Sequence, residues 1–338
     1  MKNDVNNQWV LAKRPVGMVK TTDFEQVESQ IGEAKDGEIT VKVTHIAFEP
    51  AMRGWINEGD SYVKGVEIGE VMRAQSVGEV IESKNDAYKE GDVVSGFFGW
   101  QEFSTLEPSA SMFPIQVLPE GVSPEMALSV LGITGLTAWG GMLEIGKPQE
   151  GDTVVVSGAA GATGNIAGQI AKIKGCRVIG IAGGPEKCQW LIDELGFDGA
   201  VDYKSENVSE RLKELCPDGI NIFFDNVGGK ILEAALDNIA TNARVVICGG
   251  IVGYNEEELP PGPRNYMQLV LTSSTMEGFL LGQFGPKLGQ AAMELGQWVG
   301  EGKLKFTVDV QEGFDNVPQT FLRLFEGKNL GKQLCKVA

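Results

Sequence analysis

The stretch from Gly151 to about Gly282 alternates short apolar runs with helical segments, and this alternation constrains the fold more than any other feature of the chain. The runs are Thr153–Val156, Arg177–Ala182, Ile220–Asp225 and Arg244–Cys248, and the helical segments are Gly164–Lys174, Pro185–Leu195 and Lys230–Ile239. Strands that alternate with helices of this length pair in parallel and are covered on both faces. The pattern therefore predicts an α/β domain with a parallel sheet.

The residues before about Pro119 show a different pattern, with short strand-like runs, glycine and proline between them, and no long helical period. The runs are Gln8–Ala12, Ile39–Ala47, Gln75–Glu82, Asp92–Gly99 and Gln101–Leu106. This pattern is typical of an all-β, barrel-like domain. We predict such a domain over residues 1–125 and the α/β domain over 126–304. The tail 305–338 is expected to rejoin the first domain, because its last strand would otherwise be an unpaired edge.

Charge and cysteine usage exclude several classes of protein. The 46 acidic residues outnumber the 29 lysines and arginines, and the net charge of −17 repels nucleic acid and anionic membrane surfaces. The five cysteines are far apart and odd in number, which argues against a disulfide framework and indicates a reducing compartment. The polar start and the absence of an apolar run of about 18 residues predict a soluble cytoplasmic protein.

The first apolar run of the α/β region leads into a glycine-rich turn and then a helix. Thr153–Val156 continues into Ser-Gly-Ala-Ala-Gly-Ala-Thr-Gly at positions 157–164. A strand, a glycine turn and a helix in this order bring helix N-terminal amides to a pyrophosphate. Ala159 stands where G-x-G-x-x-G has its first glycine, whereas Gly161 and Gly164 match. Dinucleotide binding is the prediction, and a purely structural turn is the alternative.

The next predicted strand ends in glycine where an NAD-specific site has a carboxylate. Gly183 and Gly184 follow this strand, so no acidic side chain is placed there to hold the ribose hydroxyls of NAD. Lys187 lies in the first turn of the following helix and can neutralise a 2′-phosphate, with a solvated surface lysine as the alternative. The pattern favours NADPH/NADP as the cofactor.

Few side chains in the sequence are suited to acid–base or metal chemistry. The single histidine, His45, lies in an alternating strand, which favours a histidine satisfied within the β domain over a member of a Ser-His-Asp triad. No His/Cys cluster supplies three ligands for a catalytic zinc. Polarisation of a carbonyl group would then come from hydroxyls, amides or the cofactor.

Two tyrosines are candidate acids. Tyr254 follows the strand Arg244–Cys248 through a glycine-containing loop, beyond the carboxyl end of a parallel strand, where α/β proteins bind ligands. Tyr62 lies in the loop after Gly59 in the β domain. An ordinary packed or surface tyrosine is the alternative for both.

Five motifs spread over the chain carry a family resemblance. They are Gln8–Pro15 (QWVLAKRP), Met52–Trp55 (MRGW), Gly158–Gly164, Phe224–Gly229 (FDNVGG) and Asn329–Lys332 (NLGK). Together they resemble the medium-chain dehydrogenase/reductase superfamily, in its zinc-free branch of NADPH-dependent double-bond reductases. This branch contains prostaglandin reductases (leukotriene B4 dehydrogenases) and bacterial curcumin reductases, and the first two motifs are most similar to the curcumin reductases. The resemblance implies a GroES-like β-barrel domain and an inserted Rossmann domain.

The resemblance also implies a set of cofactor contacts. The pyrophosphate would contact Gly161, Ala162, Thr163, Gly164 and Asn165, and the adenosine ribose phosphate would contact Lys187 and Tyr203. The remaining contacts would be Asn226, Cys248, Gly249, Gly250, Ile251, Tyr254, Phe279, Leu280, Leu281 and Asn329. Zinc-dependent relatives have a Gly-His-Glu run where this chain reads Ile68-Gly69-Glu70-Val71, so no metal is expected.

The activity implied by the resemblance is hydride transfer to the β-carbon of an α,β-unsaturated ketone or aldehyde, followed by protonation of the enolate. We expect Tyr254 to support the enolate oxygen, with Tyr62 second and the cofactor ribose hydroxyl as a competitor. The family suggests a homodimer, with Thr275–Leu281 at a sheet edge as the contact. The alternatives are a quinone reductase of the same superfamily and a non-catalytic protein that binds NADPH without consuming it.

Overall fold

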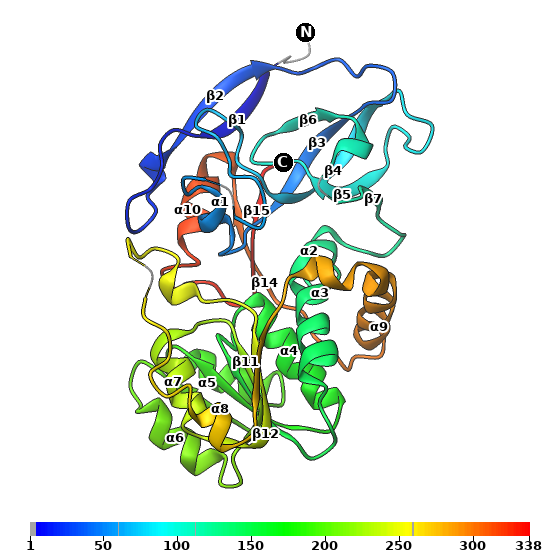
Figure 1. The fold of residues 1–338 in the computed structure, drawn as a ribbon. Coiled ribbons are helices and arrows are strands. Elements are labelled where there is room, and N and C mark those ends of the chain that lie inside the picture. The colour runs from blue at the N-terminus through cyan, green and yellow to red at the C-terminus, as the bar shows by residue number, and fades with distance from the viewer. Residues whose placement is uncertain (1–4, 60, 112, 259) are drawn as a thin grey trace. The chain divides into compact units, whose positions relative to one another are not determined.

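The structure is a computed structural model that describes residues 5–59, 61–111, 113–258 and 260–338. The chain divides into two compact units, the first made of residues 1–128 with 308–338 and the second of residues 129–307. The chain leaves the first unit after Leu128 and returns to it at Val308, so the second unit is one continuous insertion (Figure 1).

The second unit is built on a parallel sheet. In the part of the chain described, the strand order is β10-β9-β8-β11-β12-β13, and every neighbouring pair is parallel. The strands are β8 (Thr153–Ser157), β9 (Arg177–Ala182), β10 (Gly199–Asp202), β11 (Ile220–Asp225), β12 (Ile239–Ile247) and β13 (Thr275–Gly278). Val154, Val155 and Val156 of β8 are all fully buried, so both faces of the sheet are covered.

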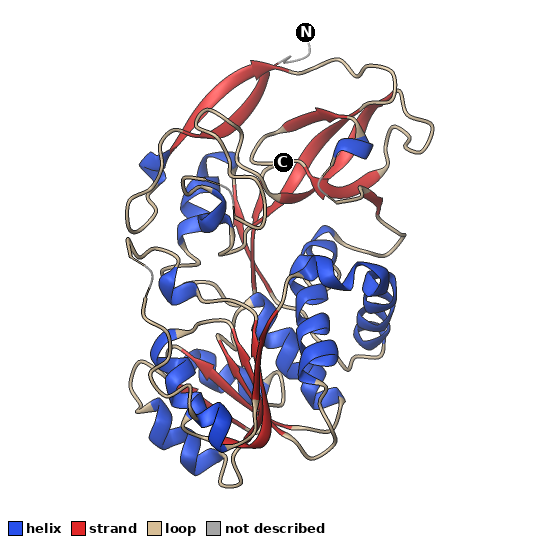
Figure 2. Ribbon diagram, in the orientation of Figure 1, coloured by secondary structure: helices blue, strands red, loops and turns tan. Residues whose placement is uncertain are grey.

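Helices cover this sheet on both sides (Figure 2). They are α3 (Ile133–Trp139), η3 (Gly140–Gly146), α4 (Ala162–Ile173), α5 (Pro185–Asp193), α6 (Val208–Leu215), α7 (Gly229–Leu236), η4 (Ile251–Gly253), α8 (Gln268–Leu271), η5 (Leu281–Lys287) and α9 (Leu288–Gly300). Phe223 of β11 lies in a core cluster with Leu212 of α6 and Leu236 of α7. The apolar faces of these helices are therefore buried against the sheet.

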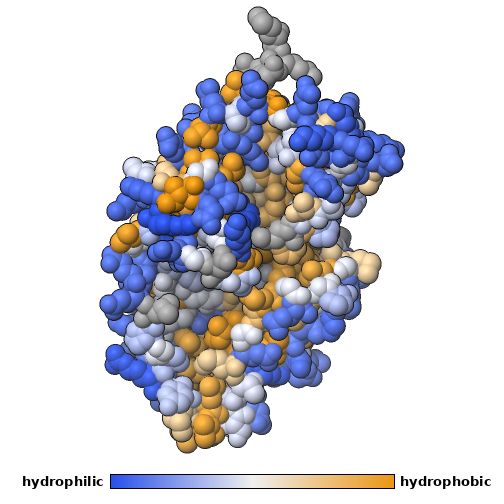
Figure 3. All heavy atoms as spheres, turned by 45° about the horizontal axis from the view of Figure 1, so that its top comes forward, coloured by the Kyte–Doolittle hydropathy of each residue, from blue (hydrophilic) through white to orange (hydrophobic). Residues whose placement is uncertain are grey.

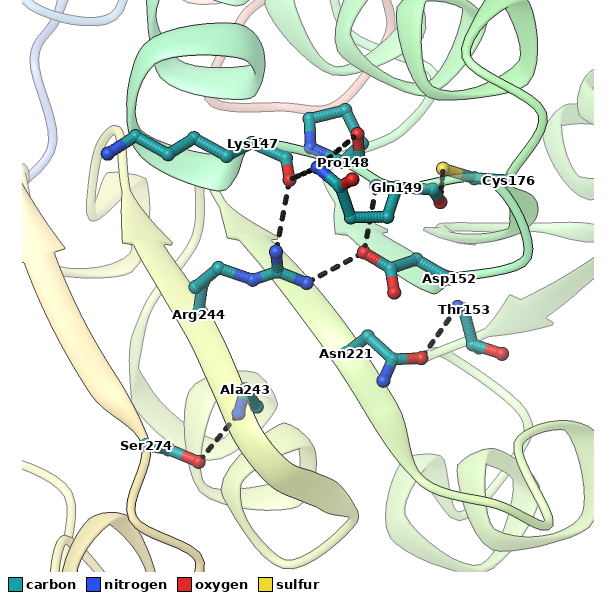
Figure 4. Close-up of polar contacts among 10 residues, drawn as sticks. All are labelled: Lys147, Pro148, Gln149, Asp152, Thr153, Cys176, Asn221, Ala243, Arg244 and Ser274. Carbon is teal, nitrogen blue, oxygen red and sulfur yellow. Dashed lines mark hydrogen bonds and ion pairs between the residues drawn. The ribbon is translucent and has the colours of Figure 1, made fainter.

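Figure 4 shows polar contacts that join strands of this sheet near their amino ends. Arg244 of β12 donates to Asp152 Oδ2 at 2.7 Å and to the carbonyl oxygen of Lys147 at 3.0 Å. The N–H of Thr153, at the start of β8, donates to Asn221 Oδ1 of β11 at 2.8 Å. These contacts connect three neighbouring strands at their amino ends. Ligands of α/β proteins bind at the other edge of the sheet, at the carboxyl ends of the strands.

The first unit contains a mixed sheet and a separate two-stranded ribbon. The sheet has the order β14-β15-β3-β4-β5-β7, with β6 also paired to β3, and the ribbon pairs β1 with β2. The strands are β1 (Val5–Leu11), β2 (Phe24–Gln30), β3 (Ile39–Ala47), β4 (Gln75–Ser83), β5 (Val93–Phe97), β6 (Phe103–Leu106), β7 (Gln116–Val117), β14 (Val308–Glu312) and β15 (Lys332–Lys336). The terminal strand β15 pairs antiparallel with β3, so the tail belongs to this sheet.

Short helices and an aromatic core complete the first unit. The helices are η1 (Thr21–Asp23), α1 (Met52–Trp55), η2 (Pro108–Ala110), α2 (Pro124–Leu128), η6 (Phe314–Asn316) and α10 (Val317–Leu322). The rings of Phe48 and Phe321 lie 5.5 Å and 5.6 Å from that of Trp100, and all three side chains are fully buried. The chain therefore has one unit with a parallel sheet and one β-rich unit, which confirms the predicted fold class.

Several boundaries predicted from the sequence are wrong. The helix predicted over Lys230–Ile239 ends at Leu236, because Asn238 donates to the carbonyl oxygen of Ala234 at 2.8 Å, and β12 begins at Ile239 instead of Arg244.

The elements in the described residues that were not predicted include β2, β10 and α6. β2 has the sequence FEQVESQ, whose polar residues face solvent, and β10 is only four residues long. α6 is N-capped by Asn207, whose side chain accepts the N–H of Glu210. An asparagine at this position is a helix-start signal that is visible in the sequence. Every helix in the described ranges falls short of the length or the apolarity needed to cross a membrane.

Candidate functional site

The carboxyl ends of β8 and β11 are joined by a buried hydrogen-bond network. Ser157, the last residue of β8, donates its hydroxyl to Asp225 Oδ1 at 2.6 Å. Asn226 donates its backbone N–H to Ser157 Oγ at 2.8 Å and its side-chain amide to the carbonyl oxygen of Ser157 at 2.7 Å. The predicted site residue Asn226 is therefore held rigidly at the ligand-binding edge of the sheet.

Asp225 anchors the turn that follows β11. Its carboxylate also accepts the N–H of Val227 at 3.0 Å and the N–H of Gly228 at 3.1 Å, and the side chain is fully buried. Burial raises the pKa of Asp225 above its ordinary value, although the hydrogen bonds from Ser157 and the two amides oppose this. Ser157 and Asp225 were not identified as site residues from the sequence. The position of Asp225, at the end of a buried strand and inside the FDNVGG motif, is a signal that could have identified it.

The glycine-rich turn after β8 has the geometry of a phosphate-binding turn. Gly158 has φ +57°, so the left-handed backbone of the turn falls on Gly158 and not on Ala159. An alanine is therefore tolerated at position 159, where the motif has its first glycine. A Cβ on Gly164 would lie 2.4 Å from the carbonyl oxygen of Gly158, so only glycine allows this approach of helix to strand. Gly161 is the N-cap of α4 and supplies no capping side chain, which fits an anion at the amides of Ala162, Thr163 and Gly164.

Asn165 serves this turn through its side chain. The side chain is buried and its amide donates to the carbonyl oxygen of Gly161 at 2.7 Å and to that of Ala162 at 3.2 Å. Gln169, one turn further along α4, donates to Asn165 Oδ1 at 3.3 Å. The side chain of Asn165 therefore shapes the turn, and its backbone N–H also donates to the carbonyl oxygen of Gly161, at 3.1 Å.

The ends of β9 and β10 form a second cluster. A Cβ on Gly183 would lie 2.9 Å from the ring of Tyr203 and 2.9 Å from Cε of Lys204, so both side chains rest against this glycine. Tyr203 is 46% exposed, and Lys187 stands in the first turn of α5, which begins two residues after Gly183. A glycine with Lys204 and an exposed aromatic ring against it, and with Lys187 in the first turn of the next helix, fits a phosphorylated adenosine ribose. Lys204 was not identified from the sequence.

The carboxylate of Asp202 lies at this edge, but its oxygens already accept hydrogen bonds from the protein. Asp202, the last residue of β10, accepts the N–H of Gly184 at 2.7 Å, the N–H of Lys204 at 3.0 Å and the hydroxyl of Ser205 at 2.8 Å. The hydrogen bond from Gly184 is the main cause that holds the pKa of Asp202 below its ordinary value. Asp202 therefore shapes the loop, and it is not placed as the ribose-binding carboxylate of an NAD site.

Tyr254 folds back over the segment that follows β12. The N–H of Gly250 donates to Tyr254 Oη at 3.3 Å, and a Cβ on Gly249 would lie 3.1 Å from the same oxygen. Tyr254 comes directly after η4, whose first residue, Ile251, donates its N–H to the carbonyl oxygen of Asn226 at 3.3 Å. The tyrosine hydroxyl and Asn226 are therefore linked through one short, hydrogen-bonded segment.

The other predicted residues of this unit border the same edge of the sheet. The N–H of Cys248 donates to the carbonyl oxygen of Asp225 at 2.9 Å, and burial raises the pKa of the Cys248 thiol to about 12, which disfavours the thiolate. A Cβ on Gly141 would lie 2.6 Å from the ring of Phe279. Leu280 is half-exposed and Leu281 begins η5, just beyond the end of β13.

Tyr62 and Asn329 belong to the first unit. Tyr62 is 55% exposed, and its Oη accepts the indole N–H of Trp55 at 2.8 Å. Burial is the main cause that raises the pKa of Tyr62 above its ordinary value. Asn329 donates its side-chain amide to the carbonyl oxygen of Gly331 at 2.9 Å. Of the residues predicted on the second unit, the network around Ser157 and Asp225 includes Asn226, Cys248, Gly249 and Ile251 by hydrogen bond. Tyr62 and Asn329 belong to the other unit.

His45 is a buried strand histidine. Its Nδ1 lies 3.0 Å from Thr44 Oγ1 and its Nε2 lies 3.8 Å from Glu125 Oε1. Among the described residues, no group of three or more His, Cys, Asp or Glu side chains is arranged to hold a metal ion. The donor set present does not fit a catalytic zinc site.

Comparison with known proteins places the chain among oxidoreductases. Residues 7–115 match the family described as the N-terminal domain of oxidoreductase, and residues 162–298 match the family described as zinc-binding dehydrogenase. Among the residues that the structure describes, no group of His, Cys, Asp and Glu side chains corresponds to the zinc named in the second description.

Relatives match the chain over almost its whole length. The NADPH-dependent curcumin reductase of Escherichia coli (strain K12) is 39% identical over 338 residues, which cover 98% of this chain and 97% of the relative. Prostaglandin reductase 1 of Bos taurus is 37% identical over 331 residues, which cover 97% and 98%. The crystal structure of CurA in complex with NADPH from Vibrio vulnificus matches with a TM-score of 0.92 at 39% identity, covering 98% of this chain and 99% of that one.

Proposed function

Because the chain belongs to the medium-chain dehydrogenase/reductase family, we propose that it is an NADPH-dependent reductase of the carbon–carbon double bond of α,β-unsaturated ketones and aldehydes. The observation that carries this proposal is the whole-chain similarity to a curcumin reductase and a prostaglandin reductase. The choice of NADPH is supported independently by Lys204 and Tyr203 against Gly183 and by Lys187 in the first turn of α5, with the nearby Asp202 bound to backbone.

The residues of the second unit would hold the cofactor along the carboxyl edge of the sheet. Within residues 161–165, the amides of Ala162, Thr163 and Gly164 suit the pyrophosphate, because those of Gly161 and Asn165 donate to backbone carbonyl oxygens. Lys187 and Tyr203 suit the ribose phosphate. Asn226, residues 248–251 and residues 279–281 would face its nicotinamide half. Asn329 is a further candidate that the family resemblance names. Bound NADPH supplies the hydride that is added to the β-carbon of the enone.

The task left to the protein is to stabilise the oxygen on which negative charge develops. A preorganised hydroxyl does this well, because it needs no reorientation as the charge forms. Tyr254 is our first candidate: its oxygen accepts the N–H of Gly250, which polarises the hydroxyl and strengthens it as a donor. Tyr62, whose oxygen accepts the indole N–H of Trp55, is the second. A ribose hydroxyl of the cofactor is the third, and none of the three requires a metal.

We also propose a homodimer formed through β13. This strand is the last of its sheet in the described chain, so its outer edge offers unpaired backbone groups to another strand. The adjoining helix α8 exposes Val270 and Leu271 to 66% and 76%. Figure 3 shows apolar residues among polar ones on the face of the molecule that it presents. A second copy, related by a two-fold axis, would pair β13 with itself and cover these side chains. Sedimentation of the chain and of Leu271→Glu tests this.

A reducing compartment such as the cytoplasm suits the five cysteines, which are all free thiols. The net charge of −17 disfavours nucleic acid as a partner. The substrate is therefore proposed to be a small molecule.

The experiment that tests the proposed function is NADPH oxidation with a panel of enals, enones, curcumin and quinones. We expect turnover with enals and enones and recovery of the saturated carbonyl compound. Turnover confined to quinones would assign the chain to the quinone reductases of the family. NADPH binding without turnover of any compound would make it a non-catalytic binding protein.

A further inference from the structure

A buried ion pair lies in the first unit, and neither of its two residues belongs to the candidate site described above. Lys332, at the start of β15, is 1% exposed, and Glu49, two residues after β3, is 6% exposed. Lys332 Nζ lies 2.5 Å from Glu49 Oε1 and donates to the carbonyl oxygen of Phe48 at 3.2 Å. Glu49 Oε2 is buried and has no hydrogen-bond partner among the described residues. The pair is therefore removed from water while one of its oxygens stays unsatisfied.

Such a pair is poorly explained by stability alone. Taking two charges out of water costs more than a single ion pair usually returns, and well-packed apolar residues of similar volume often stabilise a protein as well or better. The unsatisfied Oε2 adds to this cost. The two segments that the pair connects indicate another role for it.

On one side the pair holds the segment that carries Tyr62. The carbonyl oxygen of Glu49 accepts the N–H of Met52 at 3.0 Å, which starts α1. The last residue of α1, Trp55, is buried and donates its indole N–H to Tyr62 Oη at 2.8 Å. The charge of Glu49 is close enough to Tyr62 to act on its hydroxyl.

On the other side the pair holds the segment that carries Asn329. Lys332 directly follows Gly331, which has φ +69° and accepts the side-chain amide of Asn329 at 2.9 Å. Asn329 and Tyr62 are far apart in the sequence, and both are candidate site residues of the first unit. Glu49 and Lys332 therefore join the two segments that carry them.

We propose that the ion pair of Glu49 and Lys332 is a positioning element that holds Tyr62 and Asn329 in place for the reduction, so that both charged residues are positioning residues. This proposal rests on the proposed function. It requires that loss of the pair lower kcat through a local displacement around α1, rather than through loss of the fold.

The test compares three variants with a matched control. Glu49→Gln and Lys332→Met each remove one charge, and the double variant removes both, which relieves the lone buried charge if a single variant folds poorly. The control is Asp152→Asn with Arg244→Met, which removes a partly buried ion pair at the amino ends of the strands of the other unit (Figure 4). For each variant, kcat, the KM for an enone, the Kd for NADPH and the thermal midpoint are measured.

A spectroscopic measurement makes the test independent of activity. The six tryptophans give indole N–H signals in nitrogen-15 spectra, and Trp55→Phe identifies the signal of Trp55. If the pair positions α1, the Trp55 signal moves in Glu49→Gln and in the double variant and stays in place in the control. This result is readable even if the chain turns over no enone, so failure of the proposed function is distinguishable from failure of the positioning role.

We expect kcat to fall about tenfold to a hundredfold in the double variant, with a smaller change in the Kd for NADPH, because small displacements of reacting groups have effects of this size. The Trp55 signal should move in the same variant, and its thermal midpoint should lie near that of the control. An unmoved Trp55 signal would overturn the proposal, and so would recovery of wild-type kcat in the double variant.

Discussion

The N–H of Gly250 donates to the hydroxyl oxygen of Tyr254 at 3.3 Å, and the same oxygen lies within 3.1 Å of where a Cβ on Gly249 would stand. The hydroxyl is therefore fixed against the backbone of the segment that follows β12. That segment is bonded in turn to the carbonyl oxygen of Asp225, at the end of β11. Tyr254 thus belongs to the same network that aligns the carboxyl ends of the central strands.

From this arrangement we predict that Tyr254→Phe lowers kcat for enone reduction by about 10-fold to 1000-fold, the range found for single oxyanion donors and partial proton-transfer help. The lower end is expected if a ribose hydroxyl of the cofactor shares the role. The Kd for NADPH should hardly change. Steady-state kinetics and fluorescence titration measure the two quantities.

Tyr62→Phe and the double variant complete this test. Tyr62→Phe should cause a smaller loss, or a change in KM through substrate positioning. An unchanged kcat in Tyr254→Phe would assign the donor elsewhere, and a loss confined to KM would make Tyr254 a wall of the substrate pocket.

We predict that Lys187→Ala raises the KM for NADPH about tenfold, which corresponds to about 1.4 kcal/mol, the order of one partly exposed charge-assisted contact. The KM for NADH should stay nearly constant. Lys213→Ala removes an exposed lysine from α6 and serves as the control for the change in net charge. Equal losses with both cofactors would refute the assignment of Lys187 to the 2′-phosphate.

The elements of the second unit were largely predictable because helix and strand periods are local properties of the chain. The run Thr153–Val156 is observed as β8 with one further residue, and the predicted strands 177–182 and 220–225 are β9 and β11. β10 was missed because four residues are too few to show a period. Without β10, neither Asp202 nor Lys204 could be placed beside Gly183.

The candidate site was predictable where one segment forms it, and it was not where two strands meet. The turn 157–164 is recognisable from its own glycines. Gly158 is required by its positive φ, and Gly164 by the close approach of α4 to the carbonyl oxygen of Gly158. The bond between Ser157 and Asp225 joins residues 68 positions apart, and it depends on β8 and β11 being neighbours in the sheet. Strand order is a property of the whole sheet, so no local pattern reveals it.

Removal of metal should leave the protein unchanged, because no ligand set for zinc is present among the described residues. After exhaustive chelation and desalting, kcat and the thermal midpoint are expected to equal those of the untreated protein. Elemental analysis provides the check. A stoichiometric metal that is lost together with activity would overturn the zinc-independent mechanism.

Two glycine-to-alanine changes in helices of the second unit should have opposite effects on stability. In α4, a Cβ on Gly168 would lie 2.1 Å from the ring of Phe197, so Gly168→Ala should destabilise by about 1–3 kcal/mol through overpacking. In α9, a Cβ on Gly296 would meet Leu131 at an ordinary 3.9 Å, so Gly296→Ala should stabilise by up to about 1 kcal/mol. Urea denaturation of both variants measures these shifts, and equal signs would contradict the helix packing described.

The last prediction concerns the pH dependence of stability and uses His45, the only histidine of the chain. Burial is the main cause that lowers its pKa below the ordinary value of 6.5, although the charge of Glu125 opposes this and that of Lys336 adds to it. The unfolded chain therefore binds a proton more readily than the folded protein does. The free energy of unfolding should fall as the pH decreases through 6.5.

His45→Gln removes this proton uptake and should show a smaller decrease in unfolding free energy between about pH 7.5 and pH 5.5, a window that lies above the ordinary titration range of carboxyl groups. Urea denaturation at a series of pH values gives the slope for each protein. The difference between wild type and variant should shrink toward the acidic end, because protonation of His45 penalises only the wild type. If the two slopes are equal, His45 keeps its ordinary pKa in the fold; if the wild type gains stability on acidification, the charged imidazolium is favoured by Glu125 and the sign is reversed.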